Sequence, residues 1–420
     1  MLTSTVNESD IEAVTTTAGK GIFLQFSTRD PLPEPPSPNS PRIPTMDWNQ
    51  LRAHFPITDH WIYLNHAAVA PISRPVQRAM ERHLSDVADH GLAHIDAWHA
   101  NYAQTRRSAA KLLGAHSDEV AFLKNTTDGL IAVALGVSWR PGDTVVVAER
   151  EFPANVYPWL SLADRGVTIR TVPERDGRLR VEDFAAAIDS STRVLSVSSV
   201  EFFTGFRNDL AALGQQCRDH DILFVVDGIQ SVGALQLDVQ ALGIDCLAAD
   251  AHKWLMGPEG CALFYCSRRA LRHVKPAAMG WASVASSHDF LGYDTALHED
   301  ARRFETGTQN TVGIVGTKAA IDLLLEIGME QVEERILALT QQLADGLVRN
   351  GFELLSSRAA GEASGIITCK PPQDQSSELV AQRLLEARIH TTDRGGWLRL
   401  SPHVYNTPEE MDQTLSVMCA

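Results

Sequence analysis

Two residues stand out because their types and positions suit one kind of chemistry. Asp227 ends the apolar run DILFVVD, and Lys253 follows the apolar run DCLAAD further along the chain. A lysine amine can form an imine with an aldehyde, and a nearby carboxylate keeps a pyridine nitrogen protonated because negative charge favours the charged form. Pyridoxal 5′-phosphate (PLP) needs both groups, since its protonated ring accepts electrons when a bond to a substrate α-carbon breaks. Either residue alone is more simply a turn cap or a solvated lysine, but together with the motifs described below the pair predicts PLP.

The segments around these residues predict the framework that brings them together. Short apolar runs alternate with helical stretches, which is typical of an α/β fold whose mostly parallel sheet is buried on both faces. We expect strands at 144–149, 167–172, 193–200, 221–227, 245–250 and 261–266, with helices between them such as 181–188 and 209–220. Parallel strands end at one edge of a sheet, where such folds bind ligands, so Asp227 and Lys253 are expected to share a pocket.

A third segment could hold the phosphate of the coenzyme. Residues 123–130 read LKNTTDGL and open the helical stretch LIAVALGV, which places Thr126 and Thr127 at a helix N-terminus. Backbone N–H groups and hydroxyls at that position suit a phosphate. Taken alone, Thr-Thr-Asp is also an ordinary helix cap, so this interpretation depends on the other motifs.

Seven motifs follow one another along the chain: YLNHAAVAP (63–71), NTTDGL (125–130), EREFPANVYPW (149–159), DGIQSVG (227–233), AHKWLMGPEG (251–260), RRFETGTQN (302–310) and WLRLSPHVYNT (397–407). In their order and spacing, these motifs resemble the class V aminotransferase family of fold-type I PLP enzymes. That family includes cysteine desulfurases, selenocysteine lyases, isopenicillin N epimerases and kynureninases. The resemblance implies a large domain with a mostly parallel seven-stranded sheet, a smaller α+β C-terminal domain, and a homodimer.

The resemblance also implies roles around the coenzyme ring. Lys253 is expected to be the imine-forming lysine and the proton shuttle, and Asp227 the partner of the ring nitrogen. Gln230, on the loop after Asp227, is expected to hydrogen-bond the phenolic oxygen. Phe152 is expected to stack on the pyridine face, which suits a flat apolar ring, although a core phenylalanine is the simpler alternative.

The phosphate and the substrate are assigned in the same way. By resemblance, Thr126, Thr127 and His252 hold the phosphate, and Thr308 completes that site from the partner subunit, with a simple turn as its alternative. Arg399 lies in the otherwise apolar strand LRL, where a charge needs a partner. A guanidinium grips a carboxylate through two parallel hydrogen bonds, so the resemblance makes Arg399 the ligand of the substrate α-carboxylate. A structural salt bridge is the alternative.

The family leaves several reactions open. Our first hypothesis is a PLP enzyme acting at the α-carbon of an amino acid, either an aminotransferase or epimerase-like. The second is a cysteine desulfurase, a selenocysteine lyase or another C–S lyase. It is disfavoured because residues 387–400 contain no cysteine nucleophile, and the nearest upstream thiol, Cys369, reads as a strand residue. The third is a non-catalytic PLP-binding protein, disfavoured because Lys253, Asp227 and Arg399 are all present.

Composition narrows the remaining classes. The chain has 420 residues, 44% of them hydrophobic, which is enough for more than one domain. A net charge of −15 disfavours binding to nucleic acid. No apolar run approaches the roughly 18 residues that a membrane span needs. The six cysteines form no C-x-x-C pair, and they suggest reduced thiols in a cytoplasmic protein. We expect no bound metal ion.

The chain is expected to divide into three parts. Residues 1–45 end in the proline-rich stretch PLPEPPSPNSPRIPT and are predicted to be a disordered tail. Residues 46–310 are predicted to form the N-terminal segment and the large PLP-binding domain. Residues 311–420 carry long helical periodicity followed by short strands, which predicts the small C-terminal domain.

Overall fold

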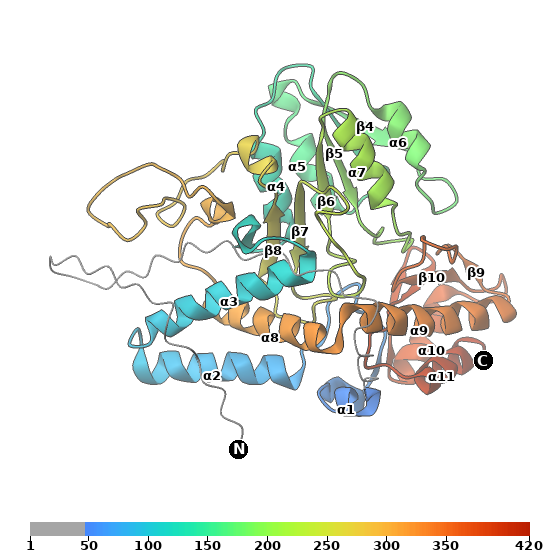
Figure 1. The fold of residues 1–420 in the computed structure, drawn as a ribbon. Helices are drawn as coiled ribbons and strands as arrows, with labels where there is room; N and C mark the ends of the chain where they lie inside the picture. The colour runs from blue at the N-terminus through green and yellow to red at the C-terminus, as the bar shows by residue number, and fades with distance from the viewer. Residues whose placement is uncertain (1–46) are drawn as a thin grey trace, which may run out of the picture. The chain divides into compact units, whose positions relative to one another are not determined.

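The centre of the fold is a seven-stranded sheet, seen in a computed structural model that describes residues 47–420 (Figure 1). The predicted tail, residues 1–45, lies outside the described residues. The strands lie in the spatial order β2 (Val120–Leu123), β8 (Ala262–Cys266), β7 (Cys246–Asp250), β6 (Leu223–Asp227), β5 (Thr192–Ser198), β3 (Thr144–Ala148) and β4 (Thr168–Val172). The predicted α/β class is confirmed, and all six expected strands are present.

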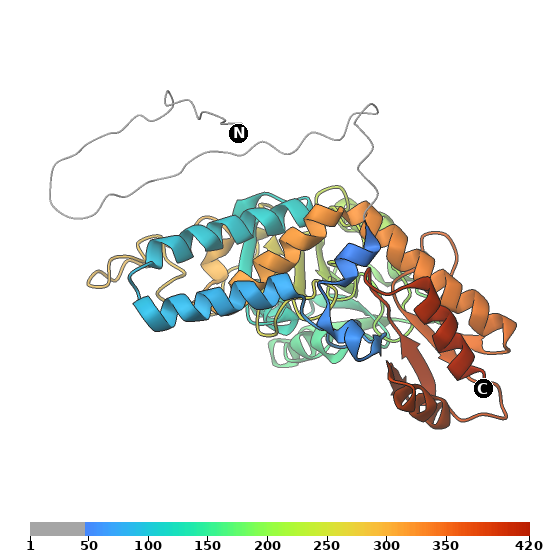
Figure 2. The same cartoon turned by 90° about the horizontal axis from the view of Figure 1, so that it is seen from below.

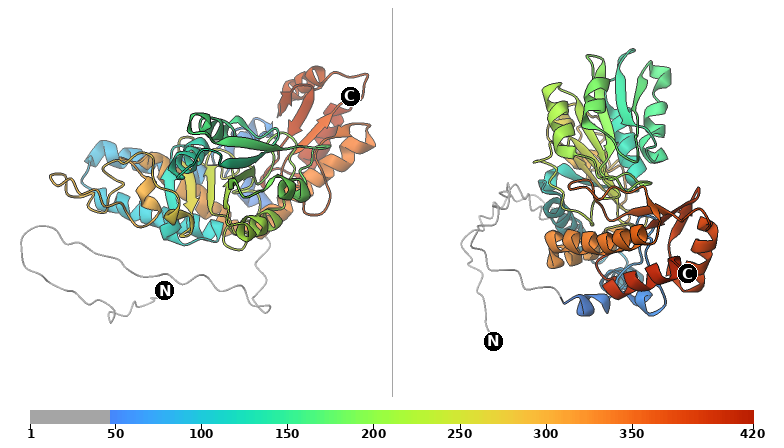
Figure 3. Two further views of the ribbon diagram at one scale, coloured as in Figure 1. Left: turned by 90° about the horizontal axis from the view of Figure 1, so that it is seen from above. Right: turned by 90° about the vertical axis from the view of Figure 1, so that its right-hand side faces the viewer.

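Only β8 runs against the other strands of this sheet. It pairs antiparallel with β2 and β7, whereas the remaining neighbours pair in parallel. Every residue of β3, β6, β7 and β8 is buried. Helices cover both faces of the sheet, as the right-hand view of Figure 3 shows. Strands covered on both sides need apolar residues at every position, which explains the continuous apolar runs in the sequence.

The helices form one group against the sheet and one beside it. Those near the sheet are α4 (Thr126–Gly136), α5 (Tyr157–Leu160), α6 (Val181–Ala187) and α7 (Leu210–Asp219). The longer helices α2 (Arg74–His90), α3 (Ile95–Leu113) and α8 (Thr311–Ile327) pack together, side by side in Figure 2. Short helices complete this part: α1 (Trp48–Arg52), η2 (Pro56–Asp59), η3 (Ser117–Glu119), η4 (Pro153–Asn155), η5 (Ala163–Arg165), η6 (Ala270–Arg272) and η7 (Ala301–Phe304). No helix in residues 47–420 is both long and apolar enough to span a bilayer.

A smaller α+β domain follows, as expected. Its antiparallel sheet has the order β12 (Thr392–Arg394), β13 (Trp397–Leu400), β10 (Ile367–Lys370) and β9 (Glu353–Leu354). Its helices are α9 (Met329–Arg349), α10 (Ser377–Glu386) and α11 (Pro408–Met418). Near the N-terminus, β1 (Ile62–Tyr63) pairs with β11 (Ile389–His390) and ties the two ends of the described chain together. A division after residue 310 stays a prediction, because α8 packs on α2 and α3 while α9 packs on α11.

Candidate active site

Asp227 ends β6 and carries an acceptor that the protein does not satisfy. The residue is 1% exposed, and its Oδ1 accepts a hydrogen bond from the backbone N–H of Ile229 at 3.0 Å. Its buried Oδ2 has no partner. Burial raises the pKa of this carboxyl to about 6, while the Ile229 bond and the charge of Lys253 oppose the rise. A protonated ring nitrogen donating to Oδ2 would satisfy the acceptor and favour the carboxylate.

Lys253 lies in the loop after β7 and shares this environment with Asp227. Its Nζ lies 5.6 Å from the ring centroid of Phe152, the residue predicted to cover the coenzyme. Burial lowers the pKa of the amine to about 8, opposed by Asp227 and assisted by the positive charges of Arg399 and Arg394. The neutral, nucleophilic amine is therefore more available near neutral pH than that of an exposed lysine.

The N-terminus of α4 lies against the end of β7, beside Lys253. The first residue of α4, Thr126, accepts a hydrogen bond through Oγ1 from the backbone N–H of Asp250 at 3.0 Å. Thr127 follows it and is partly exposed. His252 Nδ1 lies 3.1 Å from Asp250 Oδ1, close enough for an ion pair but not aligned as a hydrogen bond. The helix start and the imidazole thus lie at one end of β7, as a phosphate site requires.

Gln230 is buried in a network that joins three segments. Its Nε2 donates to the carbonyl oxygen of Ala67 at 3.1 Å, and its Oε1 accepts from the indole N–H of Trp254 at 2.8 Å. One Nε2 hydrogen remains for another acceptor, because an amide nitrogen carries two. The predicted bond to the phenolic oxygen uses that hydrogen and stays a prediction.

Arg399 is a buried cation with two free donors. It is 1% exposed, and its Nη1 donates to the carbonyl oxygen of Phe202 at 2.7 Å. Its Nε and Nη2 are buried without a partner. Burial lowers the pKa of the guanidinium to about 9, and the nearby charge of Arg394 contributes. Within residues 47–420 no carboxylate pairs with Arg399, so the salt-bridge alternative is not what the structure shows.

These groups fit PLP because each lacks the partner that the coenzyme or its substrate would provide. Asp227 Oδ2 needs a donor, and the amine of Lys253 is free to react. The start of α4 offers N–H groups for a phosphate, and Arg399 needs an anion. The arrangement can therefore bind an α-amino acid by its carboxylate and place a base beside its α-carbon.

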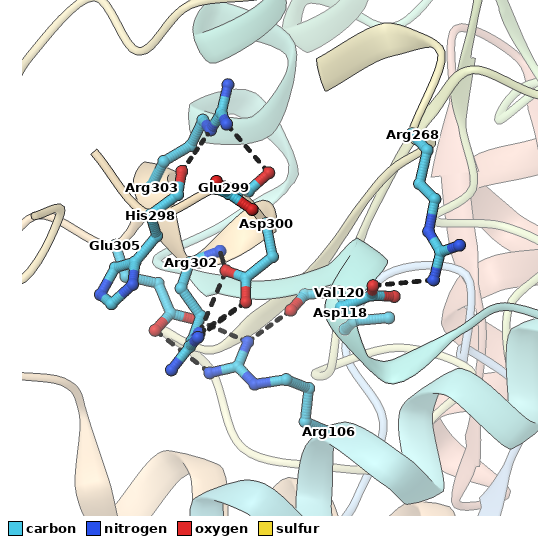
Figure 4. Close-up of polar contacts among 10 residues, drawn as sticks. All are labelled: Arg106, Asp118, Val120, Arg268, His298, Glu299, Asp300, Arg302, Arg303 and Glu305. Atoms are coloured by element: carbon cyan, nitrogen blue, oxygen red, sulfur yellow. Dashed lines mark hydrogen bonds and ion pairs between the residues drawn. The ribbon is translucent and has the colours of Figure 1, made fainter. Parts of the chain in front are cut away.

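The segment that leads to Thr308 is fixed by a buried ion pair (Figure 4). Arg106 of α3 donates to both carboxylate oxygens of Glu305, at 2.8 and 3.1 Å. Glu305 Oε1 also accepts the backbone N–H of Phe122 in β2 at 2.9 Å. Beyond this anchor, Thr308 is exposed and lines a cavity of about 330 Å³ together with Lys124. Its role in a partner's phosphate site stays a prediction.

Sequence reasoning missed Glu151, which is buried directly before Phe152. Its carboxylate oxygens accept hydrogen bonds from the backbone N–H and the hydroxyl of Ser198, at 2.5 and 2.6 Å. Ser198 is the register neighbour of Asp227 on the adjacent strand. Burial raises the pKa of Glu151 to about 7, and the charge of Asp227 adds to the rise. Nothing in the local sequence distinguishes this glutamate from an exposed one.

Arg394 is the second residue that sequence reasoning missed. Its guanidinium carbon lies 5.7 Å from the ring centroid of Phe202, and that ring meets Phe152 edge-on at 5.2 Å. Arg394 precedes a two-residue turn of Gly395 and Gly396, whose φ angles are 61° and 87°. A Gly-Gly pair between two short strands is a known hairpin signal and could have indicated that Arg394 and Arg399 are neighbours.

No cysteine occupies the position that a desulfurase would need. All six cysteines are free thiols, and none lies between Cys369 and Cys419 in the sequence. Cys369 pairs in register with Leu398, so it faces away from Arg399 and into the core of the small domain. Burial raises the pKa of its thiol. The described structure therefore offers no thiol beside Arg399 in β12 or β13.

Comparison with known proteins adds an independent line of evidence. The family model of class V aminotransferases matches residues 62–413. A probable cysteine desulfurase of Methanothermobacter thermautotrophicus is 30% identical over 397 residues, covering 87% of this chain and 96% of that protein. The cysteine desulfurase of Salmonella newport is 32% identical over 306 residues, covering 69% and 74%. The apo structure of a cysteine desulfurase from Thermococcus onnurineus NA1 superposes with a TM-score of 0.81 at 27% identity, covering 90% and 98%.

Proposed function

This chain belongs to the class V aminotransferase family of PLP-dependent enzymes, and we propose that it is a C–S lyase that needs no protein thiol. Its similarity to cysteine desulfurases supports a sulfur-containing amino acid as substrate. The observation that carries the proposal is the hairpin of β12 and β13. This hairpin presents Arg399, and neither its strands nor its turn contains a cysteine. Sulfur would therefore leave with its own substituent and would not be transferred to the enzyme.

Arg399 would orient the substrate. Its two unpartnered nitrogens match the two oxygens of an α-carboxylate, and the bond to the Phe202 carbonyl fixes the guanidinium. Phe152, whose ring lies 5.6 Å from Lys253 Nζ, would stack on the coenzyme ring. When bound, the coenzyme supplies an electron sink for the bond that breaks at the α-carbon.

Lys253 would act as the base and Asp227 as the fixed charge. The neutral amine takes the α-proton, and the Cβ–S bond then breaks with its electron pair leaving on sulfur as a thiolate. The unpartnered Oδ2 of Asp227 would hold the coenzyme's ring nitrogen in its protonated form. Hydrolysis of the remaining three-carbon fragment gives pyruvate and ammonia, so the products balance without an oxidant.

An aminotransferase or epimerase-like activity is the second candidate, and the missing thiol favours it as well. Both activities begin with the same proton transfer to Lys253, and a proton then returns to carbon, whereas elimination breaks the Cβ–S bond. The contacts of Lys253 suit all three outcomes.

The test is a product assay on the PLP-loaded protein. We expect L-cysteine and S-substituted L-cysteines to give pyruvate and ammonia in equal amounts, with sulfide or the matching thiol. Formation of alanine with sulfur retained on the protein would contradict the proposal in favour of a desulfurase. A keto acid that keeps its sulfur, or an inverted amino acid, would favour the second candidate.

We also propose a homodimer in the cytoplasm. The exposed position of Thr308, beside a cavity that Lys124 also lines, supports a contact with a second copy near the phosphate. The six free thiols support a reducing compartment. Sedimentation of the PLP-loaded protein as a monomer at micromolar concentration would contradict the dimer.

A further inference from the structure

Two arginines, and not one, face the substrate side of the site. Arg394 lies in β12 and Arg399 in β13, and the register places Arg394 opposite Trp397 and Thr392 opposite Arg399. Opposite residues of a strand pair share a face, as do alternate residues along a strand. Both arginines therefore project from the same face of the hairpin. Both also reach Phe202, one through its carbonyl oxygen and the other over its ring.

Arg394 has no acidic partner within residues 47–420. Its Nε is buried without a hydrogen bond, and its guanidinium lies over the ring of Phe202. The adjacent Asp393 projects from the opposite face of the strand and accepts a bond from the backbone N–H of Gly396. By contrast, Arg106 and Arg207 are paired with glutamates at 2.8 and 2.6 Å. A partly buried cation without a partner is costly unless a ligand supplies the anion.

One carboxylate does not satisfy both arginines. Arg399 lies deeper, at 1% exposure, and its two free nitrogens already match one carboxylate. Arg394 is half-buried and lies further out along the hairpin, next to its turn. Both arginines contact Phe202, whose ring lies 5.2 Å from that of Phe152. The Phe152 ring lies in turn 5.6 Å from Lys253 Nζ, so both arginines lie near the reacting centre. The outer arginine is thus left for an anion that the substrate carries beyond its α-carboxylate.

The hairpin holds Arg394 in place before a ligand binds. The turn of Gly395 and Gly396 has only two residues, which leaves the two strands little freedom to move relative to each other. At the other end of β12, Thr392 donates through its hydroxyl to Asn65 Oδ1 at 2.7 Å. A group fixed in this way loses little freedom on binding, which strengthens recognition.

We infer that Arg394 forms a second anion subsite, which selects S-substituted cysteines that carry a negative charge on the sulfur substituent. The inference rests on the proposed lyase function and specifies its substrate class. The thiolate that leaves would then itself carry an acidic group.

A matched pair of ligands tests this subsite. S-carboxymethyl-L-cysteine and S-carbamoylmethyl-L-cysteine have nearly the same shape. The first carries a carboxylate on its sulfur substituent, and the second carries a neutral amide there. Binding to the PLP-loaded protein is followed by the change in its visible absorbance, and pyruvate release is measured separately. We expect the carboxylate to bind about 10- to 100-fold more tightly, as one charge-assisted contact provides. In Arg394→Gln the ratio of the two dissociation constants should fall towards one, and Arg394→Lys should restore part of it.

Arg349→Gln serves as the matched control, because Arg349 is exposed at the end of α9. The Arg349→Gln variant should have the same ratio of the two dissociation constants as the unchanged protein. Equal affinity for the two ligands would overturn the subsite, and so would an equal loss of both affinities in Arg394→Gln, which would assign Arg394 to the α-carboxylate. Selective binding without pyruvate would instead overturn the lyase function and leave the subsite standing.

Discussion

The two walls of the active site are built in different ways. The coenzyme wall consists of the ends of β6 and β7, where Asp227 and the loop of Lys253 follow strands buried on both faces. The substrate wall is the β12–β13 hairpin of the small domain, where Arg394 and Arg399 remain unpaired. On the first wall, the sheet fixes the positions of the charges. On the second, the charges are positioned by a short turn and lack the partners that a substrate would supply.

The largest effect is expected from Lys253→Ala on the coenzyme wall. Loss of the imine-forming amine and of the base should lower kcat by at least about 10³-fold. It should also abolish the visible absorbance of covalently held coenzyme, recorded on the purified protein. Substantial turnover by the variant would show that another residue is the base. Retention of the absorbance would show that the coenzyme is attached elsewhere.

The anchor behind Thr308 should matter for stability. Glu305→Gln leaves Arg106, whose side chain is 13% exposed, without its charge partner, and we expect the free energy of unfolding to fall by about 3 kcal/mol. The measurement is denaturant unfolding followed by circular dichroism. Asp118→Asn is the control, because Asp118 pairs with Arg268 in an exposed contact shown in the same view (Figure 4). That change should cost less than about 1 kcal/mol. Equal effects of the two changes would argue against the anchor.

Arg399→Lys tests the substrate wall. A point charge does not reproduce the two-pronged grip of a guanidinium, so kcat/KM should fall about 100-fold. Coenzyme affinity, measured by equilibrium dialysis, should change little. If Arg399→Lys also lowered the affinity for the coenzyme, the coenzyme and the substrate would not be bound by separate walls of the site.

The smallest effect is a pH dependence of the coenzyme wall. Because burial lowers the pKa of Lys253 to about 8, its amine is protonated and unreactive below that pH and neutral above it. The rate at which coenzyme-free protein takes up PLP should therefore rise through pH 8 and level off above it, as read from visible absorbance. A rise that continues to pH 10 would indicate an ordinary, exposed amine.

The difference between the walls also decides what the sequence can predict. Asp227 and Lys253 were predicted because apolar strands are visible in the sequence and their ends meet at one edge. Arg399 was predicted because a charge inside an apolar strand is conspicuous. Glu151 and Arg394 were not predicted, because their importance arises from burial and from a cross-strand neighbour. The burial of Glu151 does not follow from its own sequence context, whereas the Gly-Gly pair after Arg394 was an available hairpin signal.

The turn at Gly395 and Gly396 also restricts how this enzyme could change its chemistry. Two-residue connections are the tightest of the common hairpin loops, so β12 and β13 are joined without a flexible segment. A sulfur-accepting thiol on a mobile loop between these strands would therefore need inserted residues as well as a cysteine.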